Sequence, residues 1–205
     1  MAIDTGYAGA AMGEYVVSPR VVTDLEKATA AAREFLMSLG VDLDAEALHR
    51  TPYRMAKAYS ELLTPDPFTL TTFENDGRYQ ELLLVRSIPF SSICEHHLLP
   101  FAGTADVGYL PGGRIAGLSK LARAVQHLAR RPHVQERLTE EIASWLHGRL
   151  DARGVGVLIR AEHTCMTWRG ANAVGARTVS QAYTGHLHES SEERSAFRAL
   201  CLSPA

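Results

Sequence analysis

The sequence predicts an α+β domain in which helices cover one face of an antiparallel sheet. Extended segments are expected at 82–88, 105–109, 155–161 and 177–183, and the second and third alternate apolar with small or polar residues. Two amphipathic helical patterns lie between these strand pairs, which gives the order strand, strand, helix, helix, strand, strand. A chain of 205 residues is long enough for one such domain with an appended helical segment.

The N-terminal part begins with residues 1–22, whose Gly and Ala content predicts a flexible tail. A helix is expected to start at Thr23, because Thr23 and Glu26 have the spacing of a capping box, and Gly40 is a typical stop. The apolar stripe of this helix comprises Leu25, Ala28, Ala32, Phe35, Leu36 and Leu39.

A second helical stretch is expected from near Asp44. Thr51 followed by Pro52 predicts a new helix start, with Thr51 as the N-cap and Pro at the first helical position. Residues 64–77 are rich in turn formers and are predicted to be a linker. The side chains predicted to face inward on the new helix are Met55, Tyr59, Leu62 and Leu63.

These patterns divide the chain into the tail at 1–22, an N-terminal helical segment with its linker at 23–77, and the main domain at 78–205. A short helix around 192–200 is expected to end the main domain. Its two central helices have the apolar stripes Leu118, Leu121, Ala122, Val125, Leu128 and Leu138, Ile142, Trp145, Leu146.

Composition excludes several classes of protein. Charged residues make up 21% and the formal net charge is -2, which argues against nucleic acid or a membrane surface as the partner. No apolar run approaches the roughly 20 residues of a membrane helix, and no secretory signal is seen. Three spread cysteines make no disulfide framework. We therefore expect a cytoplasmic protein that uses cysteine for metal binding or catalysis.

Two short motifs carry the chemistry. Cys94 and His97 have a Cys-x-x-His spacing, which lets a thiolate and an imidazole reach one zinc from a tight turn. Cys165 follows the strand that ends near His163 and supplies a third ligand. Three protein ligands leave the fourth tetrahedral position for water, which favours a catalytic over a structural Zn²⁺ site. The alternative is a buried cysteine beside surface histidines.

Two histidines remain after the ligands are assigned, and each is next to or near a ligand in the sequence. Histidine is the natural proton carrier near neutral pH, so His96 and His163 are candidate catalytic residues. Either one has the alternative role of orienting a metal ligand.

Four long motifs stand in order along the chain: Cys94-Glu95-His96-His97-Leu98-Leu99-Pro100-Phe101, Gly117-Leu118-Ser119-Lys120-Leu121-Ala122-Arg123, Arg131-Pro132-His133-Val134-Gln135-Glu136-Arg137-Leu138-Thr139 and Glu162-His163-Thr164-Cys165-Met166. In these motifs and in their order the chain resembles GTP cyclohydrolase I. Arg50 to Lys57 matches an upstream helix motif of that family, and the resemblance covers residues 23–201.

The resemblance implies a role for each matched residue. Cys94, His97 and Cys165 match the zinc ligands, and His163 matches the histidine favoured as proton donor to N7 of the purine. Gln135 and Glu136 match residues that read the guanine edge; a carboxylate accepts from both N1–H and the 2-amino group. Taken without the resemblance, Glu136 is a first-turn acid that complements the helix dipole.

The resemblance also implies a triphosphate and ribose site. Ser119, Lys120, Arg123 and Arg169 match residues that hold these groups, and Ser119 is also a plausible proton carrier. Arg54 and Lys57 match phosphate contacts that come from a neighbouring subunit. The alternative for such i, i+3 pairs is a solvated helix face.

The implied reaction is attack of zinc-bound hydroxide on C8 of GTP, release of formate, and rearrangement to 7,8-dihydroneopterin triphosphate, the first step of tetrahydrofolate and pterin biosynthesis. The implied fold is the tunnelling fold, in which the sheets of several subunits join into a barrel and two rings stack. The resemblance therefore predicts a homo-decamer in which residues 78–205 form the catalytic domain, with active sites between subunits.

Some positions depart from the family pattern. Trp168 stands where a slimmer side chain is usual, and Ala171 and Asn172 follow Gly170 where a valine is usual. Cys201 matches no functional position. The alternatives are a paralogue in a specialised pterin or deazapurine pathway, a nitrile reductase of the same fold, an enzyme that stops at the formamide, and a non-catalytic zinc-stabilised binding protein.

Overall fold

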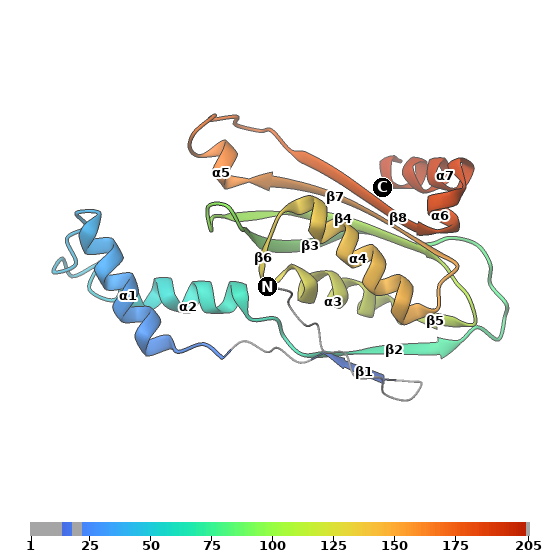
Figure 1. The fold of residues 1–205 in the computed structure, drawn as a ribbon, viewed down its shortest axis with the longest axis horizontal. Coiled ribbons are helices and arrows are strands. Elements are labelled where there is room, and N and C mark those ends of the chain that lie inside the picture. The colour runs from blue at the N-terminus through green and yellow to red at the C-terminus, as the bar shows by residue number, and fades with distance from the viewer. Residues whose placement is uncertain (1–13, 18–21, 204–205) are drawn as a thin grey trace, which may run out of the picture.

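The computed structural model describes residues 14–17 and 22–203, and the α+β architecture predicted from the sequence is confirmed (Figure 1). Its main sheet is curled and has the strand order β6-β3-β4-β7-β8. All neighbouring pairs are antiparallel except β3 and β6. The strands are β3 (Leu83–Cys94), β4 (Pro100–Leu110), β6 (Pro132–His133), β7 (Gly154–His163) and β8 (Thr178–Gly185).

Two helices cover one face of this sheet, as Figure 1 shows: α3 (Leu118–Ala129) and α4 (Gln135–Leu150). Their predicted apolar stripes largely form the core, because most of the stripe residues have no exposed surface. Ala122 and Trp145 are partly buried, and Leu118, at the first position of α3, has 62% of its surface exposed. Every second residue of β4 and β7 packs against these helical stripes. This one-sided burial explains why apolar residues alternate with small or polar ones in the sequence of both strands.

The opposite face of the sheet is partly covered by α6 (His186–Glu189) and α7 (Ser191–Leu202). Phe197 of α7 is fully buried against this face. Gly108 and Gly156 pair across β4 and β7, and a Cβ atom at either position would lie 3.0 to 3.2 Å from the Phe197 ring. The two glycines therefore provide the space in which the aromatic ring anchors α7.

Replacing Phe197 with alanine is expected to lower the free energy of unfolding by about 3 to 5 kcal/mol, because the rigid sheet cannot collapse into the vacated space. Urea denaturation followed by circular dichroism measures the change. Phe73→Ala is the matched control, because that ring is 60% exposed. Equal shifts in the two variants would contradict the anchoring role of Phe197.

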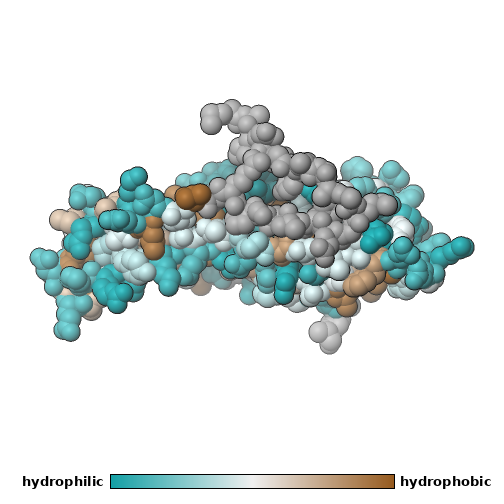
Figure 2. Space-filling model, turned by 90° about the horizontal axis from the view of Figure 1, so that it is seen from below, coloured by the Kyte–Doolittle hydropathy of each residue, from teal (hydrophilic) through white to brown (hydrophobic). Residues whose placement is uncertain are grey.

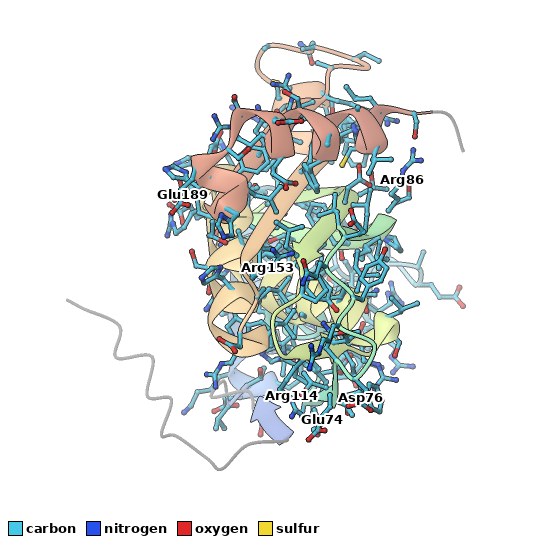
Figure 3. The ribbon with its side chains drawn as sticks, turned by 90° about the vertical axis from the view of Figure 1, so that its right-hand side faces the viewer. Glu74, Asp76, Arg86, Arg114, Arg153 and Glu189 are labelled. Carbon is cyan, nitrogen blue, oxygen red and sulfur yellow. The ribbon has the colours of Figure 1, made fainter. Side chains whose placement is uncertain are left out.

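The C-terminal end of α7 is held by two arginines. Arg86 donates to the Ser203 carbonyl over 2.6 Å, and Figure 3 shows Arg86 beside this end of the helix. Arg160 donates to the Cys201 carbonyl and forms an ion pair with buried Asp106. Burial, reinforced by the Asp106 carboxylate, raises the pKa of Cys201 to about 12. Cys201 is thus a packed, unreactive thiol.

The N-terminal helices are α1 (Leu25–Ser38) and α2 (Thr51–Leu63). The predicted N-cap of α1 was wrong by one residue, because the Asp24 carboxylate rather than the Thr23 hydroxyl accepts from the Lys27 N–H. The predicted N-cap of α2 was also wrong by one residue: Arg50 precedes the helix and Thr51 is its first residue.

The helix predicted from near Asp44 is absent, since residues 41–50 form turns and bends. The Asp42 side chain accepts the Asp44 N–H, a local hydrogen bond that competes with helix formation. The predicted linker at 64–77 contains an unpredicted strand, β2 (Phe68–Glu74), which pairs with β5 (Arg114–Ala116).

β2 also pairs with β1 (Glu14–Val17), so part of the predicted N-terminal tail is a strand. The predicted flexible tail also includes residues 1–13 and 18–21. These residues lie outside the part of the chain that the structure describes. The proposed boundaries at 22/23 and 77/78 stay predictions.

The α1 end of the molecule exposes apolar side chains. Phe35 and Leu39 of the predicted stripe are 54% and 65% exposed, and Met37 between them is 55% exposed. Figure 2 shows hydrophobic side chains among polar ones at this end. One chain alone therefore leaves this stripe uncovered at Phe35 and Leu39, while Ala32 is buried. Within the described residues, no helix combines the length and the hydropathy needed to cross a bilayer.

Candidate metal centre and active site

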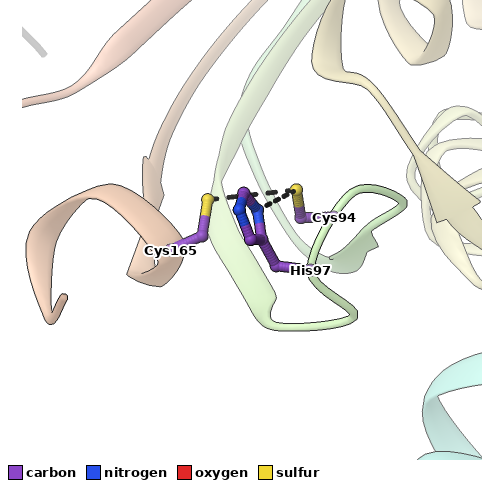
Figure 4. A group of neighbouring side chains, drawn as sticks. All are labelled: Cys94, His97 and Cys165. Carbon is purple, nitrogen blue, oxygen red and sulfur yellow. Dashed lines mark hydrogen bonds between the residues drawn. The ribbon is translucent and has the colours of Figure 1, made fainter. Parts of the chain in front are cut away.

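The three predicted metal ligands come together at one end of the main sheet. Cys94 is the last residue of β3, His97 lies in the turn that follows, and Cys165 lies in α5 (Thr164–Thr167) just after β7. The Cys94 Sγ lies 3.8 Å from the His97 Nδ1 and 3.9 Å from the Cys165 Sγ. Figure 4 shows the side chains facing one another from these two segments.

This arrangement fits a tetrahedral metal ion. Zinc bonds of about 2.3 Å to sulfur and about 2.0 Å to nitrogen put neighbouring ligand atoms about 3.5 to 3.8 Å apart. The three ligand atoms observed lie within 4.8 Å of one another, with two of the distances at 3.8 and 3.9 Å. Burial and the adjacent Cys94 thiol raise the pKa of Cys165. A divalent cation between the sulfurs would remove the repulsion that two thiolates have there.

The turn that presents His97 is fixed by backbone and side-chain contacts. Leu98 adopts a positive φ of 52°, and its N–H donates to the Cys94 carbonyl over 2.8 Å. Arg137 of α4 holds the Glu95 carboxylate at 2.6 and 2.7 Å. Tyr59 of α2 donates its hydroxyl to the Leu98 carbonyl. Two helices and a hydrogen bond within the turn therefore set the position of His97.

A cavity of about 200 Å³ opens beside the candidate ligands. Predicted site residues His96, His163, Gln135 and Glu136 line it together with all three ligands. The structure thus gathers the predicted metal, proton-transfer and base-reading groups around one space. The remaining lining residues are His133, Val134, Met166 and Thr178.

His163 has a defined position in this cavity. Its ring stacks on Phe101 with the centroids 4.4 Å apart and the planes within 6°. Its Nε2 lies 2.8 Å from the Gln135 Oε1. Burial lowers the pKa of His163, while the negative charge of Glu136 acts in the opposite direction. Glu136 is exposed in the first turn of α4 and is free to accept from a ligand in the cavity.

Gln135, predicted to read guanine, lines the cavity with its side chain turned inward. Only 1% of its surface is exposed, and its amide makes its hydrogen bonds inside the protein. His133, which was not predicted as a site residue, lies nearby and is 2% exposed. Burial lowers the pKa of His133 to about 4, so this ring is neutral at neutral pH.

The residues predicted to hold phosphate lie outside this cavity. Ser119 and Lys120 are at the N-terminal end of α3, where free backbone N–H groups favour anions. Arg123 lines a separate cavity of about 280 Å³ with His127 and Arg130. Arg169 follows α5 and is exposed beside Trp168, which is itself 76% exposed.

Arg54 and Lys57 lie on exposed positions of α2. Arg54 donates to the Ala47 carbonyl and the Thr51 hydroxyl, and Lys57 forms an exposed ion pair with Glu61. Neither residue lines the cavity beside the candidate ligands or the cavity around Arg123. Such surface contacts are weak and exchange readily for a charged ligand.

Sequence reasoning missed several residues that shape the site: Tyr59, Phe101, His133, Arg137 and Ser180. Phe101 and Arg137 stand inside the matched motifs. The motifs include these two residues but did not predict their contacts with the site. Ser180 and Tyr59 lie on segments distant in the sequence, and only the fold brings them to the site.

An α+β chain with two thiols, an imidazole and further titratable groups around one cavity has the features of a metal-dependent enzyme. A family model described as GTP cyclohydrolase I matches residues 28–202. The chain is 49% identical over 176 residues to the GTP cyclohydrolase 1 of Corynebacterium glutamicum (strain R), covering 83% of this chain and 90% of that protein.

Two further relatives show a similar identity. The GTP cyclohydrolase 1 of Aquifex aeolicus (strain VF5) is 46% identical, with 86% of this chain and 96% of that protein covered. That of Mycobacterium leprae (strain Br4923) is 45% identical, with 92% and 95% covered. The chain therefore belongs to the GTP cyclohydrolase I family and is an enzyme of that family.

Proposed function

We propose that this enzyme uses zinc to hydrolyse the imidazole ring of GTP at C8, releases formate, and forms 7,8-dihydroneopterin triphosphate. The observation that carries the proposal is the meeting of Cys94, His97 and Cys165 beside a cavity that His163 and Glu136 also line. Zinc fits this set of ligands because thiolate and imidazole donors at these separations suit its tetrahedral geometry.

A zinc ion held by Cys94, His97 and Cys165 would lower the pKa of water to about 7 and so would supply hydroxide at neutral pH. His163 donates a proton to N7 of the purine, so that the ring becomes a better electron acceptor at C8. His96, exposed on the same turn as His97, carries protons between the cavity and solvent. Two waters are consumed in ring opening and formate release, and one is returned when the new ring closes.

Glu136 selects guanine over adenine. Its carboxylate accepts from the N1–H and the 2-amino group, and adenine offers neither donor. The exposure of Glu136 at the mouth of the cavity supports this role, because its acceptor oxygens have no partner among the described residues.

The triphosphate and ribose bind to Ser119, Lys120, Arg123 and Arg169, with Ser119 as a further proton carrier during ribose rearrangement. Arg54 and Lys57 come from a neighbouring copy in a cytoplasmic homo-decamer of tunnelling-fold subunits. Two features support assembly: strand β8 is an edge strand of the main sheet, and the α1 stripe is partly uncovered in one chain.

The test is incubation of zinc-loaded protein with GTP and, separately, ATP, followed by measurement of formate and of neopterin fluorescence after oxidation. Equimolar formate and pterin from GTP, with neither from ATP, is the expected result. Accumulation of the formamide alone would restrict the function to the first hydrolysis. Retention of zinc without any consumption of GTP would overturn the proposed activity.

Substitution of Glu136 by glutamine is expected to lower kcat/KM for GTP by about 10- to 100-fold, because a charged acceptor is lost and an amide group faces the guanine donors. Steady-state formate release measures the change. Glu140→Gln is the matched control, one turn further along α4 and exposed. An unchanged kcat/KM in the Glu136 variant would remove this residue from base recognition.

A further inference from the structure

The amide of Gln135 is a buried polar group whose every hydrogen-bonding atom has a partner. Its Nε2 donates to the Ser180 hydroxyl over 2.9 Å and to the Thr178 carbonyl over 3.2 Å, and a longer contact reaches the Ile159 carbonyl at 3.4 Å. Its Oε1 lies 2.8 Å from the Nε2 of His163. The side chain thus connects β7 and β8 to the histidine of the cavity.

The direction of these hydrogen bonds is fixed by the backbone. A carbonyl oxygen only accepts, so the nitrogen of the Gln135 amide must face Thr178 and Ile159, and its oxygen must face His163. The reversed amide would place oxygen against oxygen. No rotation of the side chain therefore satisfies both ends in another way.

Two hydroxyl groups make this orientation rigid. Thr139 donates to the Gln135 backbone carbonyl over 2.7 Å, which uses its only proton. The Ser180 hydroxyl, 2.6 Å from the Thr139 Oγ1, must then donate to Thr139 and accept from the Gln135 amide. A closed ring of hydrogen bonds holds the amide in one state.

The oxygen of Gln135 can only accept, so the Nε2 of His163 must carry a hydrogen. Stacking on Phe101 holds the ring plane, which prevents the ring from turning away from this acceptor. The other ring nitrogen, Nδ1, has no hydrogen-bond partner in the part of the chain that the structure describes. It is the nitrogen left for a ligand in the cavity.

We propose that Gln135 is a positioning residue that holds His163 with its hydrogen on Nε2 and leaves Nδ1 to exchange a proton with the substrate. This inference rests on the proposed role of His163 toward N7. It replaces the expectation that the Gln135 side chain reads guanine, because an amide that turned to the base would break its contacts with Ser180, Thr178 and His163. Fixing the tautomer of a catalytic histidine through its second nitrogen is worth orders of magnitude in rate elsewhere.

The direct test is solid-state NMR of the zinc-loaded enzyme labelled with [13C,15N]histidine. The signals of His163 are identified among nine histidines by their absence from the spectrum of His163→Asn. The expected wild-type pattern is an Nε2 that carries a hydrogen, both in the neutral ring and in the protonated ring that donates to N7. In Gln135→Met, which removes the acceptor, neutral rings with the hydrogen on Nδ1 are expected as well. An Nε2 without a hydrogen in the wild type, or an unchanged pattern in Gln135→Met, would overturn the proposal.

Kinetics separate positioning from base reading. In Gln135→Met, kcat is expected to fall by about 10- to 100-fold while KM for GTP stays within about twofold, because the histidine and not the substrate loses its partner. Gln135→Glu keeps an acceptor for the Nε2 hydrogen and is expected to restore part of kcat. A rise in KM at constant kcat in the Met variant would assign Gln135 to the substrate instead.

Two further variants test whether a lower kcat comes from the loss of the Gln135 contact or from a loss of folding. Ser180→Ala removes one partner of the amide without touching His163, so a smaller fall in kcat is expected. Gln80→Met makes the same chemical change on an exposed loop at the opposite end of β3 and is expected to leave kcat unchanged. If wild-type enzyme releases no formate from GTP, the proposed function fails, while the NMR pattern of His163 still tests the role of Gln135.

Discussion

Replacement of Cys165 by serine is expected to abolish zinc binding and GTP ring opening together. The variant leaves only Cys94 and His97, and a hydroxyl is a far poorer zinc ligand than a thiolate. Zinc content should fall from about one ion per chain to near zero, and formate release should fall below detection.

Metal content is measured by plasma emission spectrometry on dialysed protein, and activity by formate release. Cys201→Ser is the matched control, because that thiol is buried where α7 packs on the main sheet and its pKa is raised to about 12. The control should keep both zinc and activity. Full activity of the Cys165 variant with its zinc lost would show that the metal has no part in the reaction.

Replacement of His163 by alanine is expected to lower kcat by about 10² to 10⁴ while zinc remains bound. The imidazole is separate from the three ligands, but it lines the same cavity and is held by Phe101 and Gln135. Its loss removes the proton donor and leaves the metal site and the base-reading acid in place.

Single-turnover measurement of formate and neopterin fluorescence distinguishes this effect from slow product release. His188→Ala is the control, because His188 is exposed on α6, away from the cavity. A His163 variant with the wild-type rate of ring opening would exclude this residue as the acid.

The strands and helices of the main domain were predictable because each buries one face. Apolar residues repeat at helical spacing in α4 and at every second position in β7. These two repeats allowed the helix and the strand to be predicted from the sequence. Strand β2 was missed for a physical reason: its flanking Pro65, Pro67 and Asn75 mark turns. Its pairing with β1 and β5 depends on segments far away in the sequence.

Local hydrogen bonds explain why the predicted N-cap of α1 and the predicted helix near Asp44 were wrong. Asp24 and Thr23 are both good N-cap residues, and only the geometry of the first turn selects the carboxylate. Residues 41–50 contain apolar residues at plausible helical spacing, yet the Asp42 side chain captures a backbone N–H there. Neither choice can be made from spacing alone.

The candidate ligands were predictable because two of them share one motif and the third follows a strand with clear alternation. The contacts that surround each candidate ligand and His163 could not be predicted from the sequence. The ring of hydrogen bonds through Thr139, Ser180 and Gln135 joins α4 to β8, and Phe101 reaches His163 across the β4–β7 pairing. These contacts are tertiary, so the sequence named Gln135 as a site residue but did not indicate its hydrogen bond to His163.

The measurement that tests the metal site most directly is X-ray absorption at the zinc edge of the enzyme as purified. The site built from Cys94, His97 and Cys165 predicts two sulfur neighbours at about 2.3 Å and two nitrogen or oxygen neighbours at about 2.0 Å, one of them water. A shell without sulfur, or with four protein ligands and no exchangeable water, would contradict it.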